Sequence, residues 1–368
     1  MNNNYIKQLD SIRAIAVLLV IITHWFPESH MLNIYTSVFN GVDIFFVLSG
    51  FLITRILLEN RIQAEKTGTN KINVIKFFFA RRFLRIFPIY YLIIFTLYIV
   101  GYRTGTDIKS NFLYFLTYSS NFYFFKRQSW DGMLSHLWSL SVEEQFYLIW
   151  PWFMLFLNKK ALLPFIVISV LIGVMAQFFL MNVMFGDILT FSCFDGFGIG
   201  ASLAWISTFK FSSLKKIYPV LILMAVVSFA LQVMRVAGFI QFPSRILTSI
   251  CTIYVITGIT LYGEKKSFFF NTFLKNGALV FIGKISYGIY LYHLILPYYT
   301  TNTFNKLNKH LPFNFYRHNF YLIHLENFFL LILICYLSWK IIEEPILKLK
   351  IYFGYQKPNH FQPSHLVD

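Results

Sequence analysis

An arginine and a histidine stand eleven residues apart at the two ends of an otherwise apolar segment. In RAIAVLLVIITH, Arg13 comes first and His24 last, and Thr23 is the only polar residue between them. On a helix, eleven residues at about 100° each place both side chains within roughly 20° on one face, about 16 Å apart along the axis. The spacing predicts that both side chains line one interior cavity. The alternative is that Arg13 and His24 extend to the two surfaces of a membrane.

Three carboxylates lie inside other apolar segments. Asp43 belongs to the second segment, and the adjacent Glu143 and Glu144 belong to the fourth. A carboxylate beside a histidine fixes the imidazole tautomer and steadies the imidazolium, which makes the pair a general base. We therefore expect Glu143 or Asp43 to orient His24. Adjacent residues point about 100° apart on a helix, so only one of the two glutamates is expected to face the cavity. Glu144 is a weak candidate for substrate contact. The alternative is that all three carboxylates are polar contacts between helices.

Arginines gather at the start of the third apolar segment. Arg81, Arg82 and Arg85 occur within residues 76–91, KFFFARRFLRIFPIYY. Arg82 and Arg85 are about one helical turn apart, and guanidinium groups suit phosphate oxygens. The cluster predicts a docking site for a phosphorylated cytoplasmic molecule. Ordinary anchoring to anionic lipid is the alternative.

A phosphate site near one membrane face and a base near the other suit a particular donor. The two would lie roughly 16 Å apart, and acyl-coenzyme A combines a phosphorylated head with a long flexible arm. No tightly bound cofactor is expected, and the three cysteines lack metal-ligand spacing, so no metal site is predicted. His293 and Lys284 are further polar residues in an apolar segment, and His293 is a weak candidate for substrate contact.

The composition requires a bilayer to position these residues. The 368 residues are 57% hydrophobic and only 13% charged, with a mean hydropathy of +0.59, which is more apolar surface than a soluble core can bury. We expect an all-α polytopic membrane protein with about ten transmembrane helices, because the apolar runs are about 20 residues long. The predicted spans are residues 9–26, 38–58, 80–100, 137–157, 161–181, 188–206, 217–235, 245–263, 276–297 and 327–347.

The positive charge fits a membrane topology better than nucleic-acid binding. The net charge is +16, but most of the 32 lysines and arginines flank apolar runs on one side, which predicts that both termini are cytoplasmic. Residues 111–125 are aromatic but interrupted by polar residues, so we expect a re-entrant or interfacial segment. The chain divides into a membrane domain, 1–351, and a polar, flexible tail, 352–368.

Six segments, in order from about Gln8 to Pro345, resemble the acyltransferase-3 family of integral membrane O-acyltransferases. They are LDSIRAIAVLLVIITHW, GVDIFFVLSGFLIT, ARRFLRIFPIYY, HLWSLSVEEQFYLIWP, ISYGIYLYHL and EEP. The resemblance implies transfer of an acyl group, often acetyl from acetyl-CoA, to hydroxyls of cell-surface glycans or other exported acceptors. It also implies that Arg13, His24, Arg82 and Arg85 are essential. Many relatives carry an SGNH domain after the last span, and this chain is expected to lack one.

The resemblance and the residues together predict an acetyl-CoA-dependent O-acetyltransferase of the bacterial inner (cytoplasmic) membrane. The expected partners are acetyl-CoA, membrane lipid and a surface or lipid-linked glycan such as lipopolysaccharide O-antigen, whereas nucleic acid is not expected. His24 is expected to act as general base, with a covalent acyl-His24 intermediate as a variant. The segment 298–326 is a candidate for acceptor contact. The alternatives are acylation of peptidoglycan or of a small metabolite and, in another class, a proton-coupled transporter.

Overall fold

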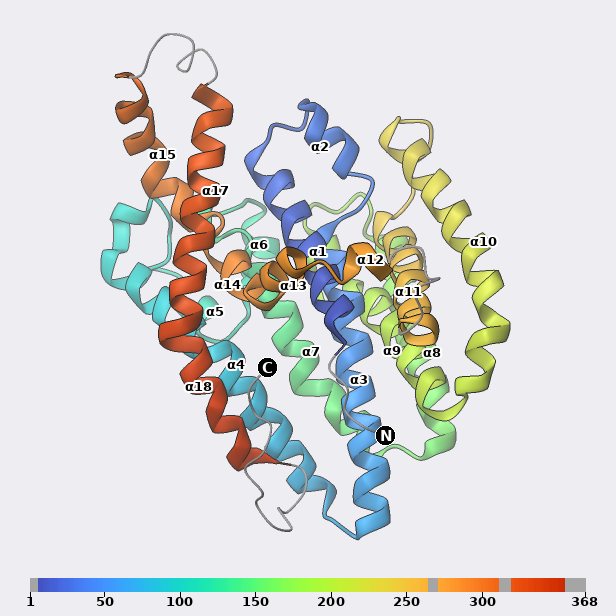
Figure 1. The fold of residues 1–368 in the computed structure, drawn as a ribbon. Helices are drawn as coiled ribbons and strands as arrows, with labels where there is room; N and C mark the ends of the chain where they lie inside the picture. Colours follow the sequence, from blue (N-terminus) through green and yellow to red (C-terminus); the bar gives the residue numbers. More distant parts are fainter. Residues whose placement is uncertain (1–5, 264–270, 311–318, 355–368) are drawn as a thin grey trace.

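The structure, a computed structural model, describes residues 6–263, 271–310 and 319–354. The regular elements in these ranges are all helical, which confirms the all-α prediction (Figure 1). Residues 355–368, most of the predicted flexible tail, lie outside the described ranges. Within the described ranges, seven helical stretches are long and apolar enough to cross a membrane. These contain α1 (Lys7–Trp25), α3 (Gly41–Thr67), α4 (Lys71–Val100), α8 (Lys159–Phe179), α10 (Phe211–Val236), α11 (Ser244–Tyr262) and α17 (Asn319–Ser338).

Two further predicted spans are helices that fall outside this group. The helix α7 (Leu137–Phe156) has the length to span, but it carries the two adjacent glutamates. The helix α9 (Phe194–Phe209) has only 16 residues, fewer than the roughly 20 that cross a bilayer without help. The short elements described are α2 (Met31–Thr36), α12 (Asn271–Leu274), α18 (Glu344–Lys348), η1 (Gly101–Thr104), η2 (Gly132–Leu134), η3 (Gly186–Ile188), η4 (Thr190–Cys193), η5 (Trp339–Glu343) and η6 (Leu349–Phe353).

The prediction of one continuous span over 276–297 is wrong. The chain there forms three helices, α13 (Gly277–Lys284), α14 (Ser286–Tyr292) and α15 (Ile295–Asn308). Side chains take up carbonyl groups near the breaks: the hydroxyl of Ser286 donates to the Gly283 carbonyl, and the indole of Trp25 donates to the His293 carbonyl at 2.8 Å. Interrupted helices persist inside a membrane protein where other residues satisfy the backbone in this way.

The aromatic segment 111–125 forms two short helices, α5 (Phe112–Leu116) and α6 (Ser120–Arg127). The chain turns between them at Tyr118, whose φ is 50°. Two tyrosines of α4 hold this turn, because Tyr90 donates to the Phe115 carbonyl at 2.7 Å and Tyr91 to the Leu116 carbonyl at 3.0 Å. Neither helix is long enough to span, in agreement with the prediction of a non-spanning segment.

Local sequence explains where several long helices begin and how closely they pack. The helix α3 packs most extensively on α9, and a Cβ on Gly50 would lie 2.0 Å from the Phe197 carbonyl oxygen, so glycine is required at this crossing. Asparagine side chains accept hydrogen bonds from the first-turn amides of four helices. These are Asn40 at α3, Asn70 at α4, Asn158 at α8 and Asn276 at α13.

The ends of the bundle differ in construction. The helices α3 and α4 extend together to the lower end in Figure 1, where a short connection joins them, whereas α15 and α17 project beyond the opposite end together with α2. Near the lower end, the buried guanidinium of Arg61 donates to the carbonyls of Met154 and Leu157 at 2.8 and 2.7 Å. Arg61 thereby caps the C-terminus of α7 and ties it to α3.

Candidate active site

A narrow cavity lies between α1, α3, α4, α7 and α14. Its water-accessible volume is about 90 Å³, and since one water needs about 10–15 Å³, the cavity holds a few waters or a slender chain. Five residues that the sequence singled out lie in its wall. They are Arg13, Arg82, Arg85, Glu143 and Glu144.

The arginines of the cavity differ in how they are paired. Arg13 forms an ion pair with Asp10 one turn away, at 2.5 Å. Arg82 lies over the ring of Tyr147, 5.1 Å from its centroid. Among the described residues, neither Arg82 nor Arg85 makes a hydrogen bond or an ion pair. Two guanidinium groups of the cavity wall are therefore available to an anionic ligand.

The remaining predicted arginine lies to one side. Arg81 is half-buried on α4 and is not part of the cavity wall. Lys350, from η6, lies within electrostatic range of Arg81, Arg82 and Arg85, and η6 packs against α4. The positive cluster therefore includes a lysine from the far end of the chain, which the sequence pattern did not reveal.

Both adjacent glutamates face the cavity, so the prediction that only one would do so is wrong. The α7 residues in the wall include Leu140 and Glu144 as well as Ser139 and Glu143. The cavity thus covers a stripe of α7 wide enough to reach two neighbouring rows of side chains. Glu143 accepts a hydrogen bond from Ser49 at 2.8 Å.

Asp43 belongs to a separate buried cluster, and the expectation that it orients His24 is wrong. Its carboxylate accepts from Nε of Arg245 at 2.8 Å. Arg245, from α11, also donates to the carbonyls of Ser192 and Asp187 at 2.7 and 3.0 Å. A buried carboxylate requires a cation, and Arg245 supplies it, so this cluster joins α3, α11 and residues 187–192.

The predicted base, His24, belongs to a cluster of three histidines. His24 is exposed on one side, and its Nδ1 lies 3.2 Å from Nε2 of the buried His293. The ring centroids of His293 and the buried His136 are 4.9 Å apart. His24 has a histidine as its ring partner, and Glu143 bonds to Ser49 instead, so the expectation that Glu143 orients His24 is also wrong.

The hydrogen-bond partners define the tautomers of this pair. Nδ1 of His293 lies 2.6 Å from the Tyr290 carbonyl, which can only accept, so the hydrogen is on Nδ1 and Nε2 holds a lone pair. Nδ1 of His24 lies between that lone pair and the Val20 carbonyl, at 3.2 and 2.8 Å. Nδ1 of His24 therefore carries hydrogen, and its Nε2 has the free lone pair that a general base needs.

The cavity and the histidine cluster share a wall rather than a single space. His24 is absent from the residues that line the cavity, which corrects the prediction that Arg13 and His24 line it together. Tyr290 does line it, donates to the His136 carbonyl at 3.1 Å, and has its ring 5.5 Å from that of His293. Arg13 thus lies in the cavity wall and His24 in the histidine cluster, and Tyr290 of α14 borders both.

Sequence reasoning missed His136 and Tyr290. His136 begins the segment HLWSLSVEEQFYLIWP, just before α7, and Tyr290 lies in ISYGIYLYHL, three residues before His293. Both stand in segments that carried the family resemblance. A polar residue at the end of an apolar run, as at position 136, was the available signal.

The fold and this site define a multi-pass helical membrane protein whose bundle encloses a cavity lined by arginine and glutamate. The sequence model of acyltransferase family 3, described as an acyltransferase domain, matches residues 6–343. The chain belongs to the acyltransferase-3 family.

Several curated proteins are similar to this chain. A putative O-acetyltransferase of Staphylococcus aureus (strain COL) is 31% identical over 323 residues, covering 78% of this chain and 50% of that protein. The peptidoglycan O-acetyltransferase OatA of Listeria monocytogenes is 37% identical over 185 residues, covering 47% and 28%. The putative peptidoglycan O-acetyltransferase YrhL of Bacillus subtilis is 39% identical over 165 residues, covering 42% and 24%. The chain spans about half the length of these relatives or less, and no solved structure gives a significant match.

Proposed function

We propose that this protein is an O-acetyltransferase that moves an acetyl group from cytoplasmic acetyl-CoA to a hydroxyl of an exported glycan. The observation that carries the proposal concerns Arg82 and Arg85, which make no hydrogen bond or ion pair among the described residues. Both lie in the wall of a cavity that shares Tyr290 with the histidine cluster. Tyr290 thus borders both the cavity with the proposed anion-binding arginines and the cluster with the proposed base. The family and the names of the relatives support acyl transfer to oxygen.

The arginines are the proposed donor site. The guanidinium groups of Arg82 and Arg85 hold phosphate oxygens of the donor, and Arg81 and Lys350 add positive charge nearby. The cavity is too narrow for a nucleotide but suits an extended thioester arm. Arg13 and His24 are roughly 16 Å apart along α1, which is the distance that the arm has to bridge.

His24 is the proposed general base. Its Nε2 removes the proton from the acceptor hydroxyl while the oxygen attacks the thioester carbonyl carbon. The carbon–sulfur bond then breaks, the imidazolium returns the proton to the thiolate, and the products are an acetyl ester and free CoA. His293 acts as a positioning residue, because it holds the hydrogen of His24 on Nδ1. An acyl-His24 intermediate is the variant of this route.

The proposed acceptor is a glycan, and there are two candidate glycans. Lipopolysaccharide O-antigen is the acceptor expected from the sequence, and peptidoglycan is the alternative. The names of the Listeria and Bacillus relatives favour peptidoglycan. We place the protein in the inner membrane of a bacterium, with membrane lipid around the bundle.

Release of free thiol from acetyl-CoA by the purified protein tests the proposal. With an acceptor present, the enzyme liberates CoA, and His24→Ala lowers this rate by about 10²–10⁴-fold, the usual contribution of a general base. A proton-coupled transporter releases no CoA. Absence of thiol release from the wild-type protein, or full activity of His24→Ala, contradicts the proposal.

A further inference from the structure

A second open space lies beside the histidine cluster, between α15 and η2. This groove has a water-accessible volume of about 610 Å³, within the range of roughly 300–1,000 Å³ that small-molecule sites occupy. The residues that line it are uncharged. Tyr298, Asn302 and Asn305 give it hydrogen-bonding groups, and Met133 and Leu294 give it apolar surface.

The apolar part of the groove leads to the histidines. Leu294 directly follows His293, and Met133 lies three residues before His136. The rings of these two histidines are 4.9 Å apart, and His293 contacts His24. A molecule in the groove therefore lies next to the cluster that contains the proposed base.

The α15 wall is held in place by polar contacts with α17. Asn305 accepts from Asn319 at 2.6 Å, and Thr301 accepts from Asn327 at 3.3 Å. Asn302 is exposed and, among the described residues, makes no such contact. Tyr298 is 50% exposed. A rigid helix thus presents an unused carboxamide and an open aromatic ring to the groove.

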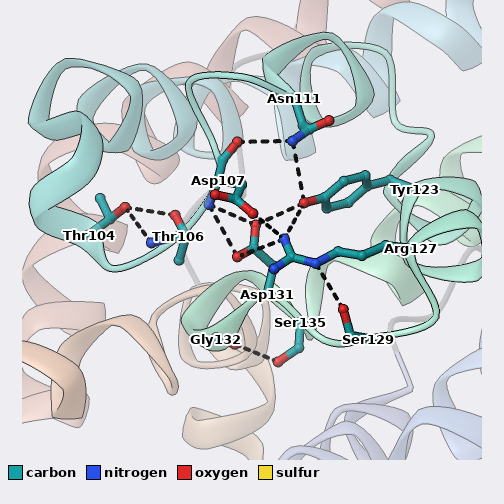
Figure 2. A network of polar contacts seen from close by, with 10 residues as sticks. All are labelled: Thr104, Thr106, Asp107, Asn111, Tyr123, Arg127, Ser129, Asp131, Gly132 and Ser135. Atoms are coloured by element: carbon teal, nitrogen blue, oxygen red, sulfur yellow. Dashed lines mark hydrogen bonds and ion pairs between the residues drawn. The ribbon is translucent and has the colours of Figure 1, made fainter.

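The charged residues near the opposite wall of the groove form ion pairs with one another. Figure 2 shows Arg127 between Asp107 and Asp131, with Nη1–oxygen distances of 2.6 and 3.4 Å. The Asp131 carboxylate also accepts from the Asp107 amide at 3.1 Å. This network fixes the backbone at Gly132, whose φ of 53° is left-handed, and leaves an uncharged surface towards α15.

We propose that this groove binds the sugar chain of the acceptor, as an uncharged run of pyranose rings bearing hydroxyl and acetamido groups. The inference rests on the proposed function, because it names the site for the acceptor of that reaction. The ring of Tyr298 suits the apolar face of a pyranose. The carboxamides of Asn302 and Asn305 suit sugar hydroxyl and amide groups. A charged polymer would find no counter-charge in the lining.

Direct binding of tetra-N-acetylchitotetraose to the purified full-length protein tests the groove without acyl transfer. Titration calorimetry compares the wild type with Tyr298→Ala and Asn302→Ala. The control is Tyr35→Ala, because Tyr35 is an exposed tyrosine of α2 and is not in the groove wall. We expect each groove variant to weaken binding at least about fivefold, the effect of one lost hydrogen bond or stacking contact, and the control to bind normally.

Two results overturn the inference: no binding by the wild type, or equal affinity in all four proteins. Thermal melts of every variant separate lost binding from lost folding, and Asn302→Asp is a second, conservative variant that adds a charge and should also weaken binding. Failure of the proposed function has a different signature, since the wild type then binds the sugar but releases no CoA from acetyl-CoA.

Discussion

Nε2 of His293 lies 3.2 Å from Nδ1 of His24, although 269 positions separate the two residues. The contact joins the end of α1 to the break between α14 and α15. It gives His24 a neutral orienting partner instead of a carboxylate. A neutral imidazole fixes the tautomer but stabilises the imidazolium less than a carboxylate does.

This partnership predicts distinct effects of the two histidines. His24→Ala should lower the rate of transfer by about 10²–10⁴-fold, whereas His293→Ala should lower kcat by about tenfold or more, because the base loses its preferred tautomer. KM for acetyl-CoA should stay constant in His293→Ala, and the pH profile of kcat should shift. Steady-state kinetics across pH measure both effects. Unchanged kcat and an unchanged profile would show that the contact only packs the helices.

The cavity arginines should control donor affinity. Arg82→Ala or Arg85→Ala each removes a charged donor, which is worth about 1.5–3 kcal/mol and corresponds to roughly 10- to 100-fold weaker binding of acetyl-CoA. Lys76→Ala is the control, because Lys76 is exposed on the same helix and is outside the cavity wall. Calorimetric titration of acetyl-CoA is the measurement. Equal affinities in all variants would assign the arginines to lipid anchoring.

The ion pair between Asp43 and Arg245 should be structural. Asp43→Ala leaves Arg245 buried without its nearest counter-ion, and the expected loss of stability is about 3–5 kcal/mol. Asp195, 3.9 Å from Arg245, partly compensates. Thermal unfolding in detergent measures the loss, and acetyl-CoA affinity of the folded fraction should match the wild type. A variant that melts at the wild-type temperature but lacks activity would contradict this structural role and support a catalytic role for Asp43.

Arg61 should stabilise the end of the bundle far from α15. Arg61→Ala leaves the carbonyls of Met154 and Leu157 without their donor, and each buried unsatisfied group costs about 1–3 kcal/mol. Arg55→Ala is the matched control, because Arg55 is on the same helix and makes only a partly exposed ion pair with Glu59. Thermal melts should show a clear drop for position 61 and little for position 55.

The sequence predicted the helical class, and it singled out five residues that share the cavity wall, but it did not predict the partners of the polar residues. Hydrophobic run length located α1, α3 and α4, and an ionisable residue in such a run is costly enough to mark a functional or structural position. Partnerships depend on tertiary packing that no spacing encodes. Nothing in the spacing of the sequence joins Arg245 to Asp43, yet the two form an ion pair.

The broken segment after α13 shows the same limit in another form. Its composition resembles that of a span, and two of the side chains that satisfy its backbone come from distant parts of the chain. Trp25 bonds to the His293 carbonyl, and a ring nitrogen of His136 bonds to the Leu291 carbonyl. No sequence pattern within 276–297 predicts that Trp25 and His136 are these partners.

The break between α14 and α15 places His293 where two sites meet. Nε2 of His293 contacts His24, and the next residue, Leu294, lies in the groove wall. The helix α15, which begins at Ile295, carries Tyr298 and Asn302 into the same wall. A single short stretch of chain therefore lines the proposed acceptor groove and contacts the proposed base.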